Sequence, residues 1–109
     1  MYVKRLWGKY KVVDIGTGYQ VKKLVINPGK AISLQMHHHR SEHWVVIRGV
    51  ATVTRAKETF ELKVNEATCI PSGMIHKLEN RTESVLKIIE IQLGEYLGED
   101  DIIRFNEDA

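Results

Sequence analysis

Four of the five histidines of this chain lie within one short stretch, residues 28–49. The stretch begins with a Pro-Gly turn and reads PGKAISLQMHHHRSEHWVVIRG. Apolar residues on both sides of its polar centre are typical of two short strands joined by a hinge. Because alternate residues of a strand point to one face, Gln35 and His37 share a face, and Glu42 can face the same cavity from the next strand. Imidazole nitrogens beside a carboxylate oxygen predict a metal site.

A further ligand has to come from much later in the chain, where His76 is the only histidine left. It follows Pro71-Ser72-Gly73, so a turn again precedes a histidine that enters a strand. Together the two segments resemble the paired motifs of the cupin superfamily, G-x5-H-x-H-x4-E-x6-G and G-x5-P-x-G-x2-H-x3-N. The second motif departs at its first glycine, where this chain has Asn65, a residue that tolerates positive φ in a tight turn.

The cupin motifs imply which residues bind the metal. With the first motif registered on Gly29, the predicted ligands are Gln35, His37, Glu42 and His76. A register that pairs His37 with His39 leaves only two residues before Glu42 and spoils the spacing from Gly29. Glutamine binds metals poorly, so the other interpretation of Gln35 is a strand residue that hydrogen-bonds a ligand or the substrate.

A Gln, His, Glu and His ligand set resembles the zinc site of phosphomannose isomerases. From about Trp7 to Phe105 the chain is similar to the type II phosphomannose isomerase domain, known best as the C-terminal part of bifunctional mannose-6-phosphate isomerase/mannose-1-phosphate guanylyltransferases. The segments that carry this resemblance are WGKY at 7–10, YQVK at 19–22, SLQMHHHRSEHW at 33–44 and GEYLGEDDI at 94–102. The resemblance implies reversible interconversion of mannose 6-phosphate and fructose 6-phosphate. It also implies one divalent cation, zinc first, with iron, nickel, cobalt or manganese as alternatives.

Glycine and proline punctuate many short apolar runs, and no long amphipathic helix is visible. This pattern predicts an antiparallel sandwich or barrel, and the resemblance makes it a single cupin-type antiparallel β-barrel (jelly roll) over residues 1–109. The expected strands are 10–15, 19–26, 31–36, 42–48, 50–55, 59–62, 67–70, 76–80 and 85–93. The acidic segment 94–109 carries a small apolar cluster and is expected to form a short helix or an arm over one end of the barrel.

Aldose–ketose isomerisation needs a proton carrier with a pKa near the working pH. His39 and Glu90 are the candidates, His39 because imidazole titrates near neutrality and shares the parity of His37 if the strand continues that far. Glu90 interrupts the longest apolar strand, where an acid is unusual unless it is paired. Arg40, with Lys22, is the predicted phosphate contact at the cavity mouth, although both have an ordinary interpretation as solvated side chains.

Charge and composition exclude several classes of protein. The net charge of +2, from 16 basic and 14 acidic residues, is too balanced for a nucleic-acid-binding protein. No apolar run approaches about 18 residues, so no membrane-spanning helix is expected. The single Cys69 fits a reducing cytosol, and we expect a cytoplasmic protein. A guanylyltransferase half does not fit into 109 residues, which predicts a stand-alone isomerase-type domain. By analogy with small cupins, we expect a homodimer paired through sheet edges.

Two other functions remain open at this stage. One is a different metal-dependent cupin enzyme, such as an iron dioxygenase, for which a third imidazole in place of Gln35 would be expected. The other is a non-catalytic cupin that binds a metal or a phosphosugar. A fold hosts many functions, so the motifs alone do not decide between them.

Overall fold

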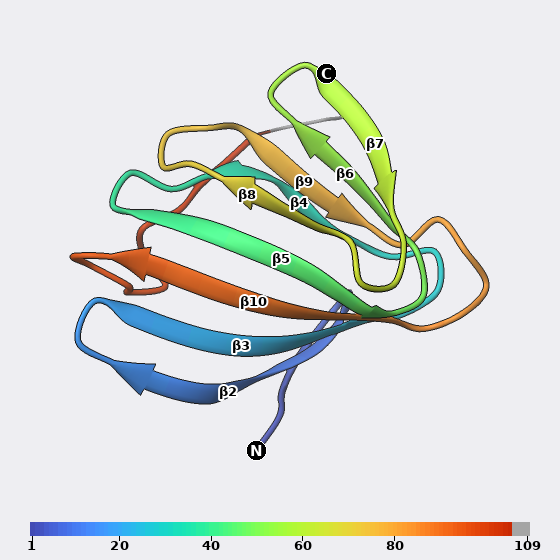
Figure 1. The fold of residues 1–109 in the computed structure, drawn as a ribbon, viewed down its shortest axis with the longest axis horizontal. Coiled ribbons are helices and arrows are strands. Elements are labelled where there is room, and N and C mark those ends of the chain that lie inside the picture. Colours follow the sequence, from blue (N-terminus) through green and yellow to red (C-terminus); the bar gives the residue numbers. More distant parts are fainter. Residues whose placement is uncertain (106–109) are drawn as a thin grey trace.

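Two antiparallel sheets face each other across the molecule (Figure 1). The computed structural model describes residues 1–105. The regular secondary structure within that range consists of strands alone. The first sheet has the order β1-β2-β3-β10-β5-β8 and the second the order β11-β4-β9-β6-β7. The strands are β1 (Val3–Arg5), β2 (Gly8–Gly16), β3 (Tyr19–Ile26), β4 (Ala31–Met36), β5 (Arg40–Arg48), β6 (Ala51–Arg55), β7 (Glu58–Leu62), β8 (Ala67–Ile70), β9 (His76–Glu79), β10 (Leu86–Gly94) and β11 (Ile103–Arg104). The predicted all-β, antiparallel fold is confirmed.

The space between the sheets is apolar at one end and polar at the other. Alternate residues of β3 and β10 point inward, and the buried ones run Ile26, Leu24, Lys22, Gln20 and Leu86, Ile88, Glu90, Gln92. The antiparallel register pairs Leu86 with Ile26 and Gln92 with Gln20. The apolar ends of the two strands therefore lie side by side, and so do their polar ends. The apolar end continues into the hydrophobic core around Val46, Val53 and Leu78. The polar end forms a cavity, where the predicted site residues other than His39 gather.

Several boundaries differ from the sequence expectations. The first strand, β1, was missed because it is short, exposed and largely basic. Strand β5 begins at Arg40, two residues earlier than expected, because β10 is long enough to pair with it as far as Gly94. The C-terminal segment forms an arm, as one of the two alternatives proposed, and no helix occurs in its described part. Its short strand β11 pairs with β4, and residues 106–109 of the expected segment lie outside the described residues.

The turns before the second histidine motif have the backbone that their residues favour. Asn65 has a φ of 75°, as expected for an asparagine in place of the motif's glycine. Gly73 has a φ of +80°, a conformation that glycine adopts without steric cost. No helix of the described residues is long and apolar enough to cross a membrane.

Asn80 fastens the loop after β9, and its replacement by alanine will destabilise the fold. Its side chain is 1% exposed, and its amide nitrogen donates to Ile26 O at 3.0 Å and to Ser84 O at 2.7 Å. Its oxygen accepts from the Thr82 N–H at 3.0 Å and from the Thr82 hydroxyl at 2.7 Å. Because Asn80→Ala leaves the buried Ile26 carbonyl, and partly buried groups of Thr82 and Ser84, without this partner, we expect a loss of about 2–4 kcal/mol in the free energy of unfolding.

Urea denaturation measures this loss. Asn27→Ala is the matched control, since Asn27 lies in an exposed turn and its hydrogen bonds within residues 1–105 are made by the backbone. The control is expected to change stability by under about 0.5 kcal/mol. Equal losses for the two variants would contradict the role given to the Asn80 side chain.

Candidate metal centre

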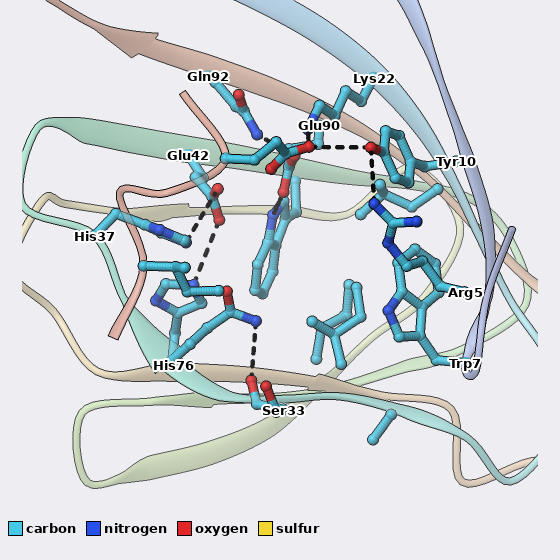
Figure 2. A pocket seen from close by; sticks show the side chains of 18 of the residues that line it. Arg5, Trp7, Tyr10, Lys22, Ser33, His37, Glu42, His76, Glu90 and Gln92 are labelled. Carbon is cyan, nitrogen blue, oxygen red and sulfur yellow. Dashed lines mark hydrogen bonds and ion pairs between the residues drawn. The ribbon is translucent and has the colours of Figure 1, made fainter. Parts of the chain in front are cut away.

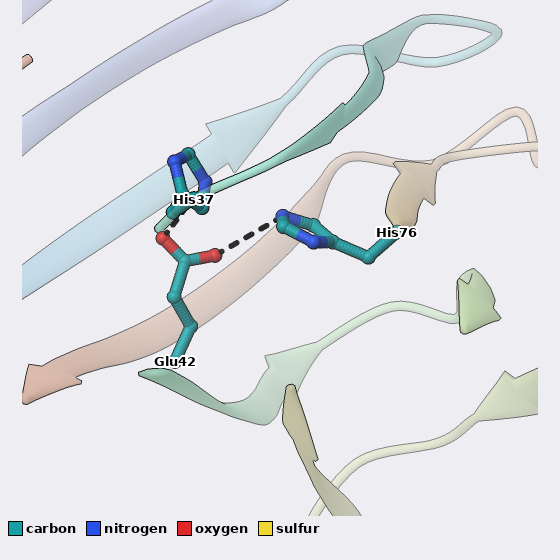
Figure 3. A group of neighbouring side chains, drawn as sticks. All are labelled: His37, Glu42 and His76. Atoms are coloured by element: carbon teal, nitrogen blue, oxygen red, sulfur yellow. Dashed lines mark ion pairs between the residues drawn. The ribbon is translucent and has the colours of Figure 1, made fainter. Parts of the chain in front are cut away.

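Three predicted ligands meet at the polar end of the inner space (Figure 3). His37 follows the last residue of β4, Glu42 lies on β5 and His76 opens β9. The Nε2 atoms of His37 and His76 lie 3.5 and 3.4 Å from the two carboxylate oxygens of Glu42. One ligand atom from each residue lies within 4.8 Å of the others, and all three side chains are buried. The structure therefore brings together His37, Glu42 and His76.

In each histidine ring, the hydrogen-bond partner of Nδ1 determines which ring nitrogen is free to bind a cation. His37 Nδ1 lies 2.6 Å from Asp101 O, and His76 Nδ1 lies 2.9 Å from Met74 O. A carbonyl oxygen only accepts hydrogen bonds, so each Nδ1 carries the hydrogen, and in the neutral ring the Nε2 lone pair points at Glu42. A carbonyl partner of this kind is the usual support of a metal-binding imidazole.

The charges of these groups also fit a cation. Burial lowers the pKa of His37, which favours the neutral ring with its free Nε2. Burial alone would raise the pKa of Glu42, but the hydrogen bond with His76 and the charges of Arg40 and His37 outweigh it and lower the pKa to about 2. An ionised carboxylate that faces two imidazole Nε2 atoms attracts positive charge, which protons on the rings supply in the metal-free protein and a divalent cation can supply in their place. The donor set therefore fits a divalent cation of the zinc type.

Arg40 lies beside these ligands rather than at the cavity mouth. Its Nη2 is 2.9 Å from Glu42 Oε2 and 3.2 Å from His37 Nε2, and its Nε donates to the same Glu42 oxygen at 3.0 Å. Its Nη1 is buried and has no hydrogen-bond partner among residues 1–105. The expected position was wrong because β5 begins at Arg40, and strand alternation then puts Arg40 and Glu42 on the same inward face.

Gln35 lines the same cavity from β4. It is 7% exposed and pairs with His76 in the β4–β9 ladder, so their side chains lie side by side. Its amide nitrogen donates to Ser33 O at 3.0 Å. The amide oxygen is therefore the atom that Gln35 can offer to a cation or to a substrate hydroxyl.

A cavity of about 510 Å³ opens in front of these ligands (Figure 2). Glu90, Gln92 and Lys22 lie along the wall formed by the first sheet. Arg5 and Trp7 lie on the far side of the cavity from the histidines. Polar groups that converge in a cavity of this volume are typical of a site for a small, polar ligand.

Glu90 is the acid that faces the cavity beside the metal ligands. Trp44 Nε1 donates to one carboxylate oxygen at 2.9 Å and Gln92 Nε2 to the other at 2.8 Å. Burial, with the negative charge of Glu42, raises the pKa of Glu90 to about 7. A carboxyl group with that pKa can both take up and release a proton near neutrality.

His39 does not reach the cavity. Strand β4 ends at Met36, so the parity that would have aligned His39 with His37 does not extend to it. Its side chain is 51% exposed, lies 3.6 Å from the Glu95 carboxylate and packs edge-on against the Tyr96 ring. The expectation that His39 lines the cavity is corrected by this placement.

Lys22 does lie in the cavity, but its charge is already paired. Its Nζ lies 3.0 Å from Glu99 Oε1 and 4.6 Å from the centre of the Tyr10 ring. Two residues at this site, Glu99 and Asp101, were missed because the acidic run near the C-terminus carries no spacing signal that ties it to the histidines. Only strand pairing across the molecule places them here.

Known proteins resemble this chain in sequence over almost its whole length. The family model described as "Mannose-6-phosphate isomerase C-terminal" matches residues 1–107. The xanthan biosynthesis protein XanB of Xanthomonas campestris is 50% identical over 105 residues, and the alginate biosynthesis protein AlgA of Pseudomonas aeruginosa is also 50% identical. The mannose-1-phosphate guanylyltransferase RfbM of Salmonella typhimurium is 51% identical. Each match covers 96% of this chain, and the chain spans 22% of the length of these relatives.

Solved structures share the fold at low sequence identity. An oxalate decarboxylase of Lactobacillus farciminis superposes with a TM-score of 0.82 at 19% identity, over 98% of this chain and 34% of that one. The cupin domain of Cnp3 from Schizosaccharomyces pombe gives a TM-score of 0.76 at 14% identity, over 79% of this chain and 64% of that one. These likenesses identify the fold as that of the cupins.

Proposed function

The chain belongs to the family of mannose-6-phosphate isomerase C-terminal domains, and from that premise we propose that it interconverts mannose 6-phosphate and fructose 6-phosphate in a metal-dependent reaction. One observation carries the proposal: a buried His37–Glu42–His76 cluster shares a cavity with an acid whose pKa lies at about 7. The names of the relatives support the substrate class, because one of them refers to mannose 1-phosphate.

His37, Glu42 and His76, with Gln35 as a possible fourth donor, would hold the divalent cation. When bound there, the cation supplies Lewis acidity that polarises the sugar oxygens. The remaining chemistry is a pair of hydrogen shifts in the same direction, from position 2 of the sugar to position 1. Conversion of the aldose to the ketose moves one hydrogen from C2 to C1 and another from O2 to O1, through an enediol.

Glu90 is the residue that we assign to the carbon-bound proton. In its ionised form it takes the proton from C2 and becomes neutral, and it then returns the proton to C1. The donors on Trp44 and Gln92 hold its two oxygens in place and stabilise the ionised form. His39 is not proposed for this step, because its exposed ring lies outside the cavity.

The phosphate group is assigned to cations that line the cavity and have no acidic partner among the described residues. Lys22 and Arg40 are paired with Glu99 and Glu42 respectively, so neither charge is free. Arg5, Lys30 and Arg104 also line the cavity, and no ion pair joins them to a carboxylate within residues 1–105. A phosphate dianion attracts such unpaired cations. This assignment replaces the sequence-based one on Arg40 and Lys22.

A coupled assay tests the proposal. Purified protein of known metal content is given mannose 6-phosphate, and fructose 6-phosphate is followed before and after chelation. We expect chelation to remove the activity and zinc or cobalt to restore it. No turnover by protein that carries one metal ion per chain would refute the isomerase and favour the non-catalytic, phosphosugar-binding alternative. Mannose without its phosphate is the control substrate, and it should give a much higher KM.

A further inference from the structure

The segment after β10 crosses from one sheet to the other beside the metal ligands. We call residues 95–105 the closing arm. At its start Glu99 Oε1 lies 3.0 Å from both Lys22 Nζ and Tyr10 OH, which belong to the first sheet. At its end β11 pairs with β4 of the second sheet, and the Phe105 N–H donates to Leu34 O at 2.9 Å. The closing arm is therefore anchored on both sides of the cavity.

Asp101 lies midway along this arm and contacts all three residues of loop 37–39, which we call the ligand loop. Its carboxylate oxygens accept the backbone N–H groups of His38 and His39, each at 2.9 Å. Its backbone carbonyl accepts the Nδ1–H of His37 at 2.6 Å. Asp101 is 7% exposed, although most acidic side chains remain on the surface.

The ligand loop needs such support, because no strand ladder fixes it. Residues 37–39 lie between the end of β4 and the start of β5. The one other bond of the described structure that fixes the His37 backbone is donated by the Gly73 N–H to His37 O, at 2.7 Å. Two groups favour the hydrogen on Nδ1 of the His37 ring: the Asp101 carbonyl accepts from Nδ1, and the Arg40 guanidinium, which can only donate, lies 3.2 Å from Nε2. The Asp101 carbonyl holds the Nδ1 side of the ring and thereby turns Nε2 towards Glu42.

We propose that Asp101 is a positioning residue of the metal centre, whose carboxylate clamps the ligand loop so that its own carbonyl aligns the His37 ring. The inference rests on the metal site of the proposed function and is independent of the substrate. Asp101→Asn keeps the size of the side chain but replaces one acceptor oxygen by an amide that donates. One of the two backbone N–H groups then loses its acceptor, and the loop loses its fixed position.

The test measures metal affinity with the metal alone. Zn²⁺ and Co²⁺ dissociation constants are determined by competition with a chromophoric chelator, and the absorption spectrum of the Co²⁺ form is recorded. Asp101→Asn is expected to raise the dissociation constant about 10–100-fold and to shift the Co²⁺ spectrum. Asp100→Asn is the matched control, since the neighbouring Asp100 is exposed and its side chain, within residues 1–105, accepts a hydrogen bond from the Tyr96 hydroxyl alone; it should change affinity by less than about threefold.

A double-mutant cycle shows whether Asp101 acts through His37. In a His37→Ala background, Asp101→Asn should add less than about a threefold loss of affinity, because the ring that it aligns is gone. A lower melting temperature with unchanged affinity and spectrum would reduce Asp101 to a purely structural role and overturn the inference. Wild-type protein that binds neither Zn²⁺ nor Co²⁺ would overturn the metal centre itself, and with it the proposed function.

A measurement on the wild-type protein avoids any variant that fails to fold. Long-range ¹H–¹⁵N correlation spectra of the metal-free protein distinguish the two tautomers of a neutral histidine. We expect His37 to carry its hydrogen on Nδ1, bonded to the Asp101 carbonyl. A hydrogen on Nε2 would refute the alignment by Asp101.

Discussion

Replacing Glu90 by glutamine is expected to lower kcat for mannose 6-phosphate about 10²–10⁴-fold, with the metal still bound. The glutamine keeps the size of the side chain but cannot take up the C2 proton. Within residues 1–105 the hydrogen bonds of the Glu90 carboxylate go to Trp44 and Gln92 and not to His37, Glu42 or His76, so metal stoichiometry should stay at the wild-type value. The Gln92 and Gln20 amides can both turn over, so that Gln92 accepts a hydrogen bond from the new amide and donates one to Gln20, which allows the fold to persist.

The pH dependence of kcat provides a second test of Glu90. Burial raises its pKa from the ordinary value of 4.5 to about 7. A base has to be ionised, so wild-type kcat should rise with pH through the pKa of Glu90, which a cation bound beside Glu42 lowers from about 7, and Glu90→Gln should lose that limb. Glu61→Gln, at an exposed position of β7, is the matched control and should keep both the rate and the pH profile. Glu90→Gln with wild-type kcat would refute the assignment.

The free energy of unfolding should fall with rising pH, whereas kcat should increase. The folded chain keeps the Glu90 proton up to about pH 7, whereas the unfolded chain releases it near pH 4.5. The free energy of unfolding of the wild type therefore falls as pH rises through that window, and the loss is complete above pH 7. Because Glu90→Gln lacks this loss, its melting temperature relative to wild type should rise from pH 5 to pH 8. A falling difference would contradict the raised pKa.

Replacing Glu42 by glutamine is expected to abolish both metal binding and isomerisation. Loss of groups that only support a metal ligand typically costs 10–100-fold in affinity, so loss of the central carboxylate should cost at least about a hundredfold. The substitution also leaves the buried Arg40 guanidinium without its carboxylate partner. Removing one member of a buried ion pair typically costs about 3–5 kcal/mol, and metal-free Glu42→Gln should be destabilised by that amount.

Glu79→Gln is the matched control for this variant. Glu79 is also a carboxylate in an ion pair, with Arg81 and Lys77, but it lies at the other end of β9, away from the cavity. Metal content and kcat should stay within about twofold of wild type, as for surface substitutions. Glu42→Gln that retained one metal ion per chain at wild-type affinity would exclude Glu42 as a ligand.

The pH dependence of the melting temperature in acid provides a separate test of Glu42. Its pKa in the folded protein is lowered to about 2, against 4.5 ordinarily. Its contribution to stability is therefore fully present above about pH 4.5 and is lost as pH falls towards 2. Wild-type melting temperature should decrease across that range, and Glu42→Gln should show a shallower decrease. Parallel curves would contradict the coupling of Glu42 to its positive neighbours.

Residue spacing was enough to predict the fold and to select the residues that meet at the centre. Period-two alternation decides which side of a strand a residue faces, so the sharing of a face by Gln35 and His37 was visible in the sequence. The same rule misplaced His39, because it depends on where the strand ends, and β4 ends at Met36. The fold prediction is confirmed, whereas the roles of the ligands stay predictions until metal binding is measured.

The sequence by itself predicted an antiparallel all-β fold, because alternation and turns are local, and its resemblance to the cupin motifs predicted the cupin barrel and the metal-ligand types. Only the tertiary structure decided what neighbours those groups. Arg40 is neutralised by Glu42 because β5 starts two residues early, and the pKa of Glu90 is raised because its strand end is buried between the sheets. Asp101 reaches His37 across 64 residues of sequence. Such contacts depend on how distant strands pair, and no local pattern records that.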